Sequence, residues 1–518
     1  MMNMQLRRAC VAGTGLLAVV MGGALGCNTT KAPEQAANSK AEAPIDAKID
    51  WNKVVLVSKS TPTLQVVTNP MLNPGAPIHD GSFAALKALG ADYVRYVPWL
   101  PYPKIAVAEL DPPTKEKTSW DFTYIDPVTK DFLAATEGHS TIINFSTIPS
   151  WMFKTDKPVQ YPSDPNQVFW NYTQGTELVD PTGKQLGDYF GRLVSWYTKG
   201  GFTDENGKRH DSGNHYTFPY WEVLNEVDSE HSTTPEDYTK RYDAIVEGIR
   251  KVSPQTKFMG MALAWTGKDP RYYEYFLNPK NHKPGIPLDY ISYHFYASPA
   301  ANEGLDDWQH SFFNQADGFL TTSRFILSIR DRLSPSTKID TDELGVILPN
   351  DNDEKAEDRM TFNRIPQRYW NAAGALYAYL FAELSKQGVD VIGESQLVGY
   401  PSQFPSVSMI NYKTGEPNAR YWVLKLIKDN FHPGDKLVTT ADGSGDVEIQ
   451  GFITPQGKKV LIANKTNSEK TVKLAADLQN ASTLTVDEAT GDKAPREGKV
   501  EGGELKLAPF AVTVLTVQ

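Results

Sequence analysis

The chain is nearly devoid of cysteine. Only Cys10 and Cys27 occur among its 518 residues, so removal of a leader before Cys27 would leave the folded part without any disulfide. Basic residues are also in deficit, because 52 Lys and Arg stand against 62 Asp and Glu, a formal net charge of −10. Nucleic-acid binding needs a basic footprint, so a nucleic-acid partner is not expected.

Long apolar runs are lacking too. The run at residues 11–26 follows Arg7 and Arg8 and is shorter than the roughly 20 residues of a membrane-spanning helix. Residues 1–27 therefore have the pattern of an export signal. Their end, Ala-Leu-Gly-Cys, resembles a bacterial lipobox, in which Cys27 would be lipidated and become the new N-terminus.

We therefore expect export, either as a cell-envelope lipoprotein tethered to the membrane through Cys27 or as a simply secreted periplasmic or extracellular protein. Residues 28–50 are rich in Ala, Lys, Pro and Glu without an apolar period. Such a composition predicts a flexible linker.

The remaining sequence has a globular composition, with 40% hydrophobic and 22% charged residues. No internal repeat is visible, but strand-like and helix-like runs alternate eight times over residues 63–432. This alternation predicts an α/β protein with a (β/α)8 TIM barrel. Residues 433–518 instead contain short alternating segments separated by turn residues, which predict an all-β sandwich. We expect residues 51–62 to add a strand to that sandwich.

Two glutamates end predicted strands of the barrel. Glu226 ends strand four and Glu343 ends strand seven, at the face where barrels of this type carry their active sites. Cleaving a glycosidic bond needs two carboxyl groups, one on each side of the anomeric carbon. Either glutamate alone could be structural. Strand alternation also places Asp340 and Asp342 on one face and Glu343 on the other, so the choice of acid at strand seven is open.

The Asn225-Glu226 pair and Glu343 resemble the motifs of clan A glycoside hydrolases. The chain is most similar to family 39, which includes β-xylosidases and α-L-iduronidases and also has a C-terminal β-sandwich. The likeness covers about residues 53–518, with Val227 standing where the family motif has proline. It implies retention by double displacement, with Glu343 as nucleophile, Glu226 as acid/base and Asn225 bonded to a sugar hydroxyl.

Five further residues are candidates for contacts with a sugar. His294 and Tyr296 lie two apart near the end of strand six, where clan A places such side chains, although both could be core polar groups. Arg95 is a charged residue within an apolar strand, so it is expected to pair with a carboxylate, either in the site or as a structural ion pair. Trp151 could be a sugar platform or a packed loop residue. Glu394 ends strand eight and could bind hydroxyls or be structural.

Other chemistries lack their motifs. The sequence has no zinc-type His or Cys spacing, no phosphate-binding glycine loop and no hydrolase elbow, so we expect neither a metal nor a cofactor. The prediction is a retaining glycoside hydrolase acting on oligo- or polysaccharides. The alternative is a non-catalytic, carbohydrate-binding surface lipoprotein on a barrel scaffold, and transglycosylation by the same residues is also compatible. The sugar, the linkage and the oligomeric state have no signature in the sequence.

Overall fold

A computed structural model describes residues 43–170, 175–349, 351, 365–400, 404–441 and 445–517. The expected leader, Cys27 and most of the expected linker lie outside these residues. Among the helices that are described, none combines the length and the apolarity needed to cross a bilayer.

Eight parallel strands close into a barrel, which confirms the predicted fold. In chain order they are β3 (Thr61–Val67), β4 (Val94–Val97), β5 (Thr141–Ile143), β8 (Tyr220–Val223), β9 (Lys257–Leu263), β10 (Tyr290–Ala297), β11 (Lys338–Val346) and β12 (Val391–Glu394). Nearly every residue of these strands is buried, as expected for parallel strands that are covered on both faces.

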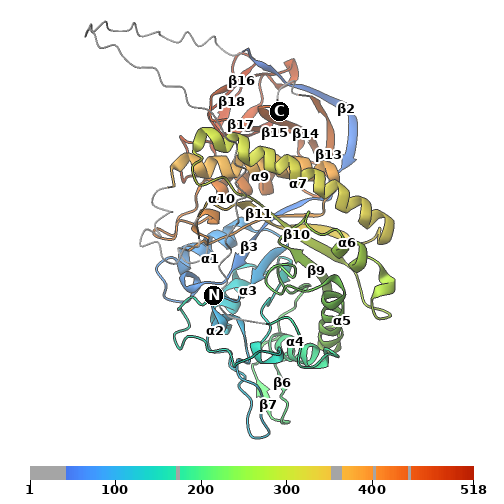
Figure 1. Ribbon diagram of the computed structural model, residues 1–518. Coiled ribbons are helices and arrows are strands. Elements are labelled where there is room, and N and C mark those ends of the chain that lie inside the picture. The colour runs from blue at the N-terminus through green and yellow to red at the C-terminus, as the bar shows by residue number, and fades with distance from the viewer. Residues whose placement is uncertain are drawn as a thin grey trace, which may run out of the picture. The chain divides into compact units, whose positions relative to one another are not determined.

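Helices surround the barrel strands (Figure 1). They are α1 (His79–Leu89), α2 (Pro103–Ala106), α3 (Asp126–Ala135), α4 (Lys184–Thr198), α5 (Pro235–Val252), α6 (Arg271–Phe276), α7 (Leu305–Leu333), α9 (Gln367–Gln387) and α10 (Ala419–Asn430). Helices α4 and α5 lie side by side in close contact. This approach requires glycine, because a Cβ on Gly248 would lie 1.9 Å from the carbonyl oxygen of Gly187.

The C-terminal region forms a seven-stranded sheet in the order β18-β17-β20-β15-β14-β13-β2 and a three-stranded sheet in the order β1-β16-β19. Their strands are β1 (Ile45–Asp46), β2 (Lys48–Val57), β13 (Lys436–Ala441), β14 (Val447–Thr454), β15 (Gly457–Asn464), β16 (Lys470–Lys473), β17 (Ser482–Val486), β18 (Arg496–Lys499), β19 (Glu504–Leu507) and β20 (Val512–Thr516). An apolar core that includes Ile449, Ile462 and Leu515 joins the two sheets. The all-β domain therefore has an apolar core between its two sheets, while residues of the larger sheet such as Phe452 and Leu461 join the core of the barrel.

The N-terminal limits of both domains differ from the prediction. Strands β1 and β2 begin within the segment expected to be a linker, so that prediction is wrong at its C-terminal end. Ala47, Ile49 and Trp51 alternate with polar residues and pack against the sandwich core, a pattern too short to stand out in the sequence. Strand β2 pairs antiparallel with β13 and ends at Val57. The barrel then begins at Thr61, two residues earlier than predicted.

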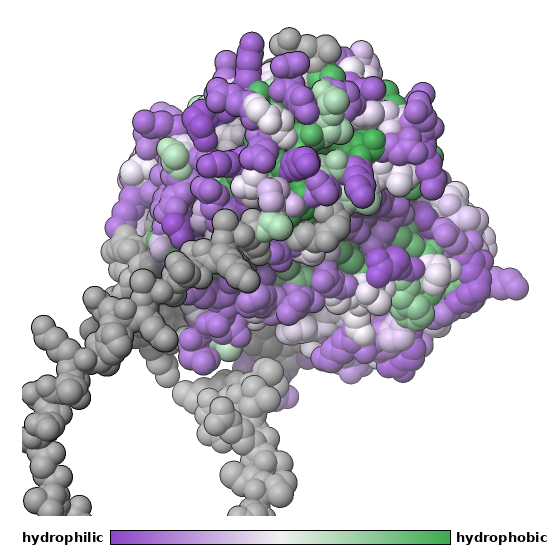
Figure 2. All heavy atoms as spheres, turned by 90° about the horizontal axis from the view of Figure 1, so that it is seen from above, coloured by the Kyte–Doolittle hydropathy of each residue, from purple (hydrophilic) through white to green (hydrophobic). Residues whose placement is uncertain are grey.

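The sandwich packs on the barrel through α9 and α10. The rings of Phe431, just after α10, and Phe452 of β14 lie 4.3 Å apart. The Lys459 ammonium donates to Asn430 Oδ1 at 2.8 Å across the same boundary. Viewed from the side of the sheets, the surface is mainly hydrophilic with small apolar patches (Figure 2).

Candidate active site

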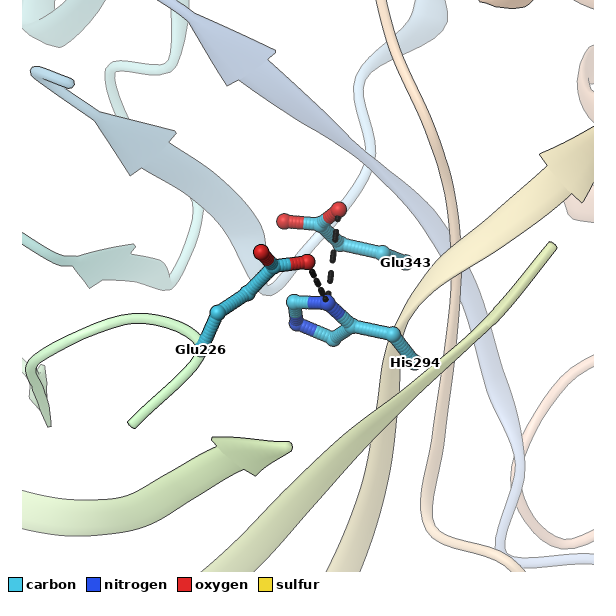
Figure 3. Close-up of side chains that lie close together, drawn as sticks. All are labelled: Glu226, His294 and Glu343. Atoms are coloured by element: carbon cyan, nitrogen blue, oxygen red, sulfur yellow. Dashed lines mark hydrogen bonds and ion pairs between the residues drawn. The ribbon is translucent and has the colours of Figure 1, made fainter. Parts of the chain in front are cut away.

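The two predicted glutamates lie at the same end of the barrel and face each other. Glu226 comes from the loop after β8 and Glu343 from β11, with His294 of β10 beside both (Figure 3). His294 Nδ1 lies 3.2 Å from Glu226 Oε1 and 3.5 Å from Glu343 Oε2. One oxygen from each glutamate and this nitrogen all lie within 4.8 Å of one another. The two carboxyl groups therefore border one shared space.

The backbone turns sharply after β8 to place Glu226. Leu224 and Glu226 have φ values of 67° and 44°, in the left-handed region that non-glycine residues rarely adopt. The Glu226 N–H donates to the carbonyl of Ala262 in β9 at 2.9 Å. Asp228 accepts from the N–H of Ala264 at 3.0 Å and of Trp265 at 2.9 Å, which ties the same loop to the end of β9. Backbone strain of this kind is often found at functional sites.

A β-bulge in β11 places Glu343 in the site. The pairing with β10 runs from Ser292 opposite Asp340 to His294 opposite Glu343, so β11 contains one extra residue. A bulge of this kind breaks strict alternation and redirects side chains. Consequently Asp342 and Glu343 both contact Arg95, and the prediction that they face opposite sides of the strand is wrong.

Arg95 lies beneath the site and binds its polar groups. Its side chain is 1% exposed. Its Nε donates to Glu222 Oε2 at 2.5 Å, and its Nη1 donates to Glu343 Oε1 and Gln65 Oε1, each at 2.6 Å. Its Nη2 donates to Asn225 Oδ1 at 2.6 Å. The expected pairing of Arg95 with a carboxylate is confirmed; Arg95 is not among the residues that line the cavity, and it orients groups that do line it.

Tyr296 and Asn225 both line the cavity. The Tyr296 hydroxyl donates to Glu343 Oε2 at 2.6 Å, so each oxygen of this glutamate has a hydrogen bond. Asn225 Nδ2 donates to Glu230 Oε1 at 3.0 Å, and the indole N–H of Trp99 donates to the same oxygen. Glu230 thereby connects the loop after β8 with Trp99, which follows β4. No feature of the sequence had pointed to Glu230.

Burial and neighbouring charges shift the pKa values of Glu226 and His294. Burial raises the pKa of Glu226; the hydrogen bond from His294 opposes this rise, and the negative charge of Glu343 adds to it. Burial alone would lower the pKa of His294, but the charges of Glu343 and Asp342 outweigh it and raise that pKa well above the usual 6.5. The three side chains therefore form one electrostatically coupled acid–base group.

The glutamates open into a cavity of about 480 Å³ with aromatic walls. Trp99, Trp265, Phe295 and Phe404 contribute to these walls, and Trp265 is 55% exposed. The ammonium of Lys268 lies 5.7 Å from the centre of the Trp265 ring. Flat apolar rings combined with a few convergent polar groups are typical of small-molecule sites. Phe404 belongs to an irregular segment, which explains why no periodic pattern had marked it.

Two predicted sugar contacts lie elsewhere. The indole N–H of Trp151 donates to the carbonyl of Glu109 at 2.9 Å, and its half-buried ring packs against the core. Glu394 is fully buried, accepts from Arg420 Nε at 2.9 Å, and has its pKa raised to about 7 by burial. Neither side chain is among the residues that line the cavity, and the contacts of both favour the structural alternative.

Comparisons with known proteins match two parts of the chain to family models. The family model described as glycosyl hydrolases family 39 matches residues 81–312. A second model, the C-terminal immunoglobulin-like domain of D-apionate lactonase, matches residues 446–515. No curated protein matches the chain significantly.

Solved structures of glycosidases are similar over most of the chain. The family 51 α-L-arabinofuranosidase from Thermotoga petrophila RKU-1 is 14% identical with a TM-score of 0.59, covering 92% of this chain and 100% of its own. The glucosidase from Croceicoccus marinus is 13% identical with a TM-score of 0.58, covering 91% and 98%. The GH30 endoxylanase from Clostridium papyrosolvens C71 is 12% identical with a TM-score of 0.51, covering 91% and 99%. At these identities the likeness establishes the fold alone.

The family match, together with the barrel, defines a glycoside hydrolase. Within that class, residues 81–312 are similar to the glycosyl hydrolases of family 39. Its substrate is a carbohydrate.

Proposed function

We propose that the protein is a retaining glycosidase that cleaves O-glycosidic bonds of oligo- or polysaccharides by double displacement. The observation that carries this proposal is the separation of the two glutamates, because an oxygen of Glu226 lies within 4.8 Å of an oxygen of Glu343. Retaining enzymes hold their carboxyl groups about 5–5.5 Å apart, whereas inverting enzymes need about 6.5–9.5 Å to admit a water molecule. The short separation favours direct attack by a carboxylate.

In the first step Glu343 attacks the anomeric carbon while Glu226 protonates the departing oxygen. Arg95 and Tyr296 each bind one oxygen of Glu343, so the nucleophile is held in a fixed orientation. The raised pKa of Glu226 keeps its proton available as the pH approaches neutrality. In the second step Glu226, now a carboxylate, takes a proton from the water that hydrolyses the glycosyl-enzyme.

Hydrolysis of a panel of aryl glycosides tests this assignment. Wild-type protein is expected to release the aryl alcohol from at least one sugar. Glu226→Ala and Glu343→Gln should each lower kcat/KM by about 10²–10⁴-fold or more, the usual contribution of one acid–base group. Glu137→Gln is the control, because Glu137 is an exposed glutamate that precedes β5 and is not among the residues lining the cavity. Equal absence of turnover in all four proteins, together with tight glycan binding, would instead support the carbohydrate-binding alternative.

The leader suggests where this activity takes place. We propose export and attachment to the membrane through lipidated Cys27, based on the apolar run that precedes this residue. Metabolic labelling with a radioactive fatty acid tests it: label should enter the wild-type protein and be absent from Cys27→Ser. Release of unlabelled wild-type protein from the cell would favour simple secretion.

A further inference from the structure

His294 lies between three carboxyl groups. Its Nδ1 lies close to both catalytic glutamates, while its Nε2 lies 3.5 Å from Asp342 Oδ2 on the opposite side of the ring. The imidazole is 2% exposed, so water offers it little compensation. A neutral imidazole has one N–H and one lone pair, and in this position the lone pair would have to face an acid oxygen. The geometry therefore suits an imidazolium with a proton on both nitrogens.

Asp342 in turn depends on this cation. It is 2% exposed, and its oxygens have no hydrogen-bond donor among the residues whose placement is described. Its compensation is ionic: Arg95 Nε lies 3.1 Å away and His294 Nε2 lies 3.5 Å away. Arg95 also binds Glu222 and Glu343, so one guanidinium serves three acids. A buried carboxylate needs a paired charge, and His294 supplies the second cation.

The other titratable groups around His294 do not replace Asp342. Burial raises the pKa of Asp340 well above its usual value, with the charges of Asp342 and Glu222 adding to the rise. Burial also raises the pKa of Glu222 to about 7, against the opposing effect of Arg95. Burial opposes the ionisation of Asp342, but Arg95 and His294 outweigh it and hold that pKa at about 2. Asp342 is therefore ionised throughout the physiological range.

We propose that Asp342 is a positioning residue that keeps His294 as a doubly protonated imidazolium, whose Nδ1–H donates to whichever catalytic glutamate is negatively charged. This inference rests on the retaining mechanism proposed above. It depends on the bulge in β11, because strict alternation would not bring Asp342 and Glu343 to the same histidine.

The role follows from how charge moves during the reaction. When Glu343 bonds to the anomeric carbon, the glycosidic C–O bond breaks and the proton of Glu226 passes to the leaving oxygen. The negative charge thus moves from Glu343 to Glu226, and hydrolysis of the intermediate moves it back. The Nδ1–H of His294 lies between Glu226 Oε1 and Glu343 Oε2 and can change from one acceptor to the other with a small displacement. The histidine itself keeps both of its ring protons.

Nitrogen NMR of protein labelled with ¹⁵N-histidine tests the charge state directly. The chain has nine histidines, and the His294 signals are those missing from His294→Gln. The wild-type protein is expected to show two protonated ring nitrogens for His294 up to at least pH 8. A neutral His294 at pH 7 in the wild-type protein would overturn the proposal, and this measurement requires no folded Asp342 variant.

Asp342→Asn should lower the His294 pKa by at least about one unit, because the neutral amide no longer favours the imidazolium. Asp340→Asn is the matched control: Asp340 lies in the same strand, and burial raises its pKa well above the usual value, so it carries little charge to lose and its replacement should leave the imidazolium intact. Identical His294 titration in wild type and Asp342→Asn would contradict the role of Asp342. If His294 is doubly protonated but the protein cleaves no glycoside, the proposed function is rejected, while the charge assigned to His294 still stands.

The pH profile of kcat/KM provides a second readout. In the wild type Glu226 sets the alkaline limb, whereas in Asp342→Asn the loss of the proton from His294 is expected to come first, so the decline of kcat/KM should begin at lower pH; Asp342→Glu should restore part of the difference. A purely structural role would lower the melting temperature without moving the limb.

Discussion

Glu109 is a buried carboxyl group whose ionisation should destabilise the fold. Its side chain is fully buried, and it follows α2 and pairs through a backbone bridge with Trp120. No cation in the described part of the chain forms an ion pair with it. Burial, together with the negative charge of Glu205, raises its pKa from 4.5 to about 8.

The sign and size of the effect follow from linkage. The folded protein binds this proton more tightly than the unfolded chain, so the free energy of unfolding falls as the pH rises from about 4.5 to about 8. One pKa unit corresponds to about 1.36 kcal/mol, so the 2.5 units between pH 4.5 and pH 7 cost about 3 kcal/mol. Glu109→Gln removes the ionisable group and should recover this energy at pH 7, with little effect at pH 4.

Urea unfolding of wild type and Glu109→Gln at pH 4, 7 and 8.5 measures the difference. The exposed Glu137→Gln serves as control and should leave stability unchanged at every pH. A Glu109→Gln effect of equal size at all three values would refute the reasoning, because a packing change has no pH dependence. Lower stability of the variant at pH 7 would refute it as well.

Three further predictions follow from the site. Glu394→Ala leaves Arg420 as an uncompensated buried charge, so the free energy of unfolding should fall by about 3–5 kcal/mol while the KM of the folded protein stays unchanged; a raised KM would restore a substrate role. Trp151→Ala should leave KM within about twofold, whereas Trp265→Ala should raise KM about fivefold, as expected from loss of roughly 1 kcal/mol of ring contact; equal effects of the two substitutions on KM would contradict the assignment of Trp265, and not Trp151, to the cavity wall. The activity of the wild type should decline as the pH rises through the raised pKa of Glu226. Glu226→Ala should lose this alkaline decline and regain turnover of aryl glycosides when azide is added. If the variant keeps the decline, a residue other than Glu226 is the acid.

The sequence predicted the barrel and the two glutamates because both depend on local patterns. Buried parallel strands are continuous apolar runs, and Glu226 and Glu343 stand where two of these runs end. The structure brings them together because parallel strands of a barrel end on one face. The strand expected at residues 51–62 corresponds to β2, but the start of β2 at Lys48 and the two-residue β1 were missed, since the inward residues there alternate for only a few positions among charged ones.

The remainder of the site depends on contacts that no local pattern encodes. Which way Asp342 and Glu343 point is decided by the bulge in β11, and a bulge has no reliable sequence signature. Glu394 ends a strand just as Glu226 and Glu343 do, but Arg420, from a helix 26 residues later, pairs with it in the interior. Trp151 follows a proline in a loop, where a platform and a packed ring look the same in sequence.

The anomeric configuration of the first product is the most direct test of the central claim that two carboxyl groups act on one sugar ring without an intervening water. Proton NMR is recorded within minutes of adding wild-type protein to a glycoside that it hydrolyses. The spectrum then resolves the two anomers of the released sugar before they equilibrate. We expect the first product to have the same anomeric configuration as the substrate. A first product of inverted configuration would contradict it, since Glu343 could not then be the nucleophile.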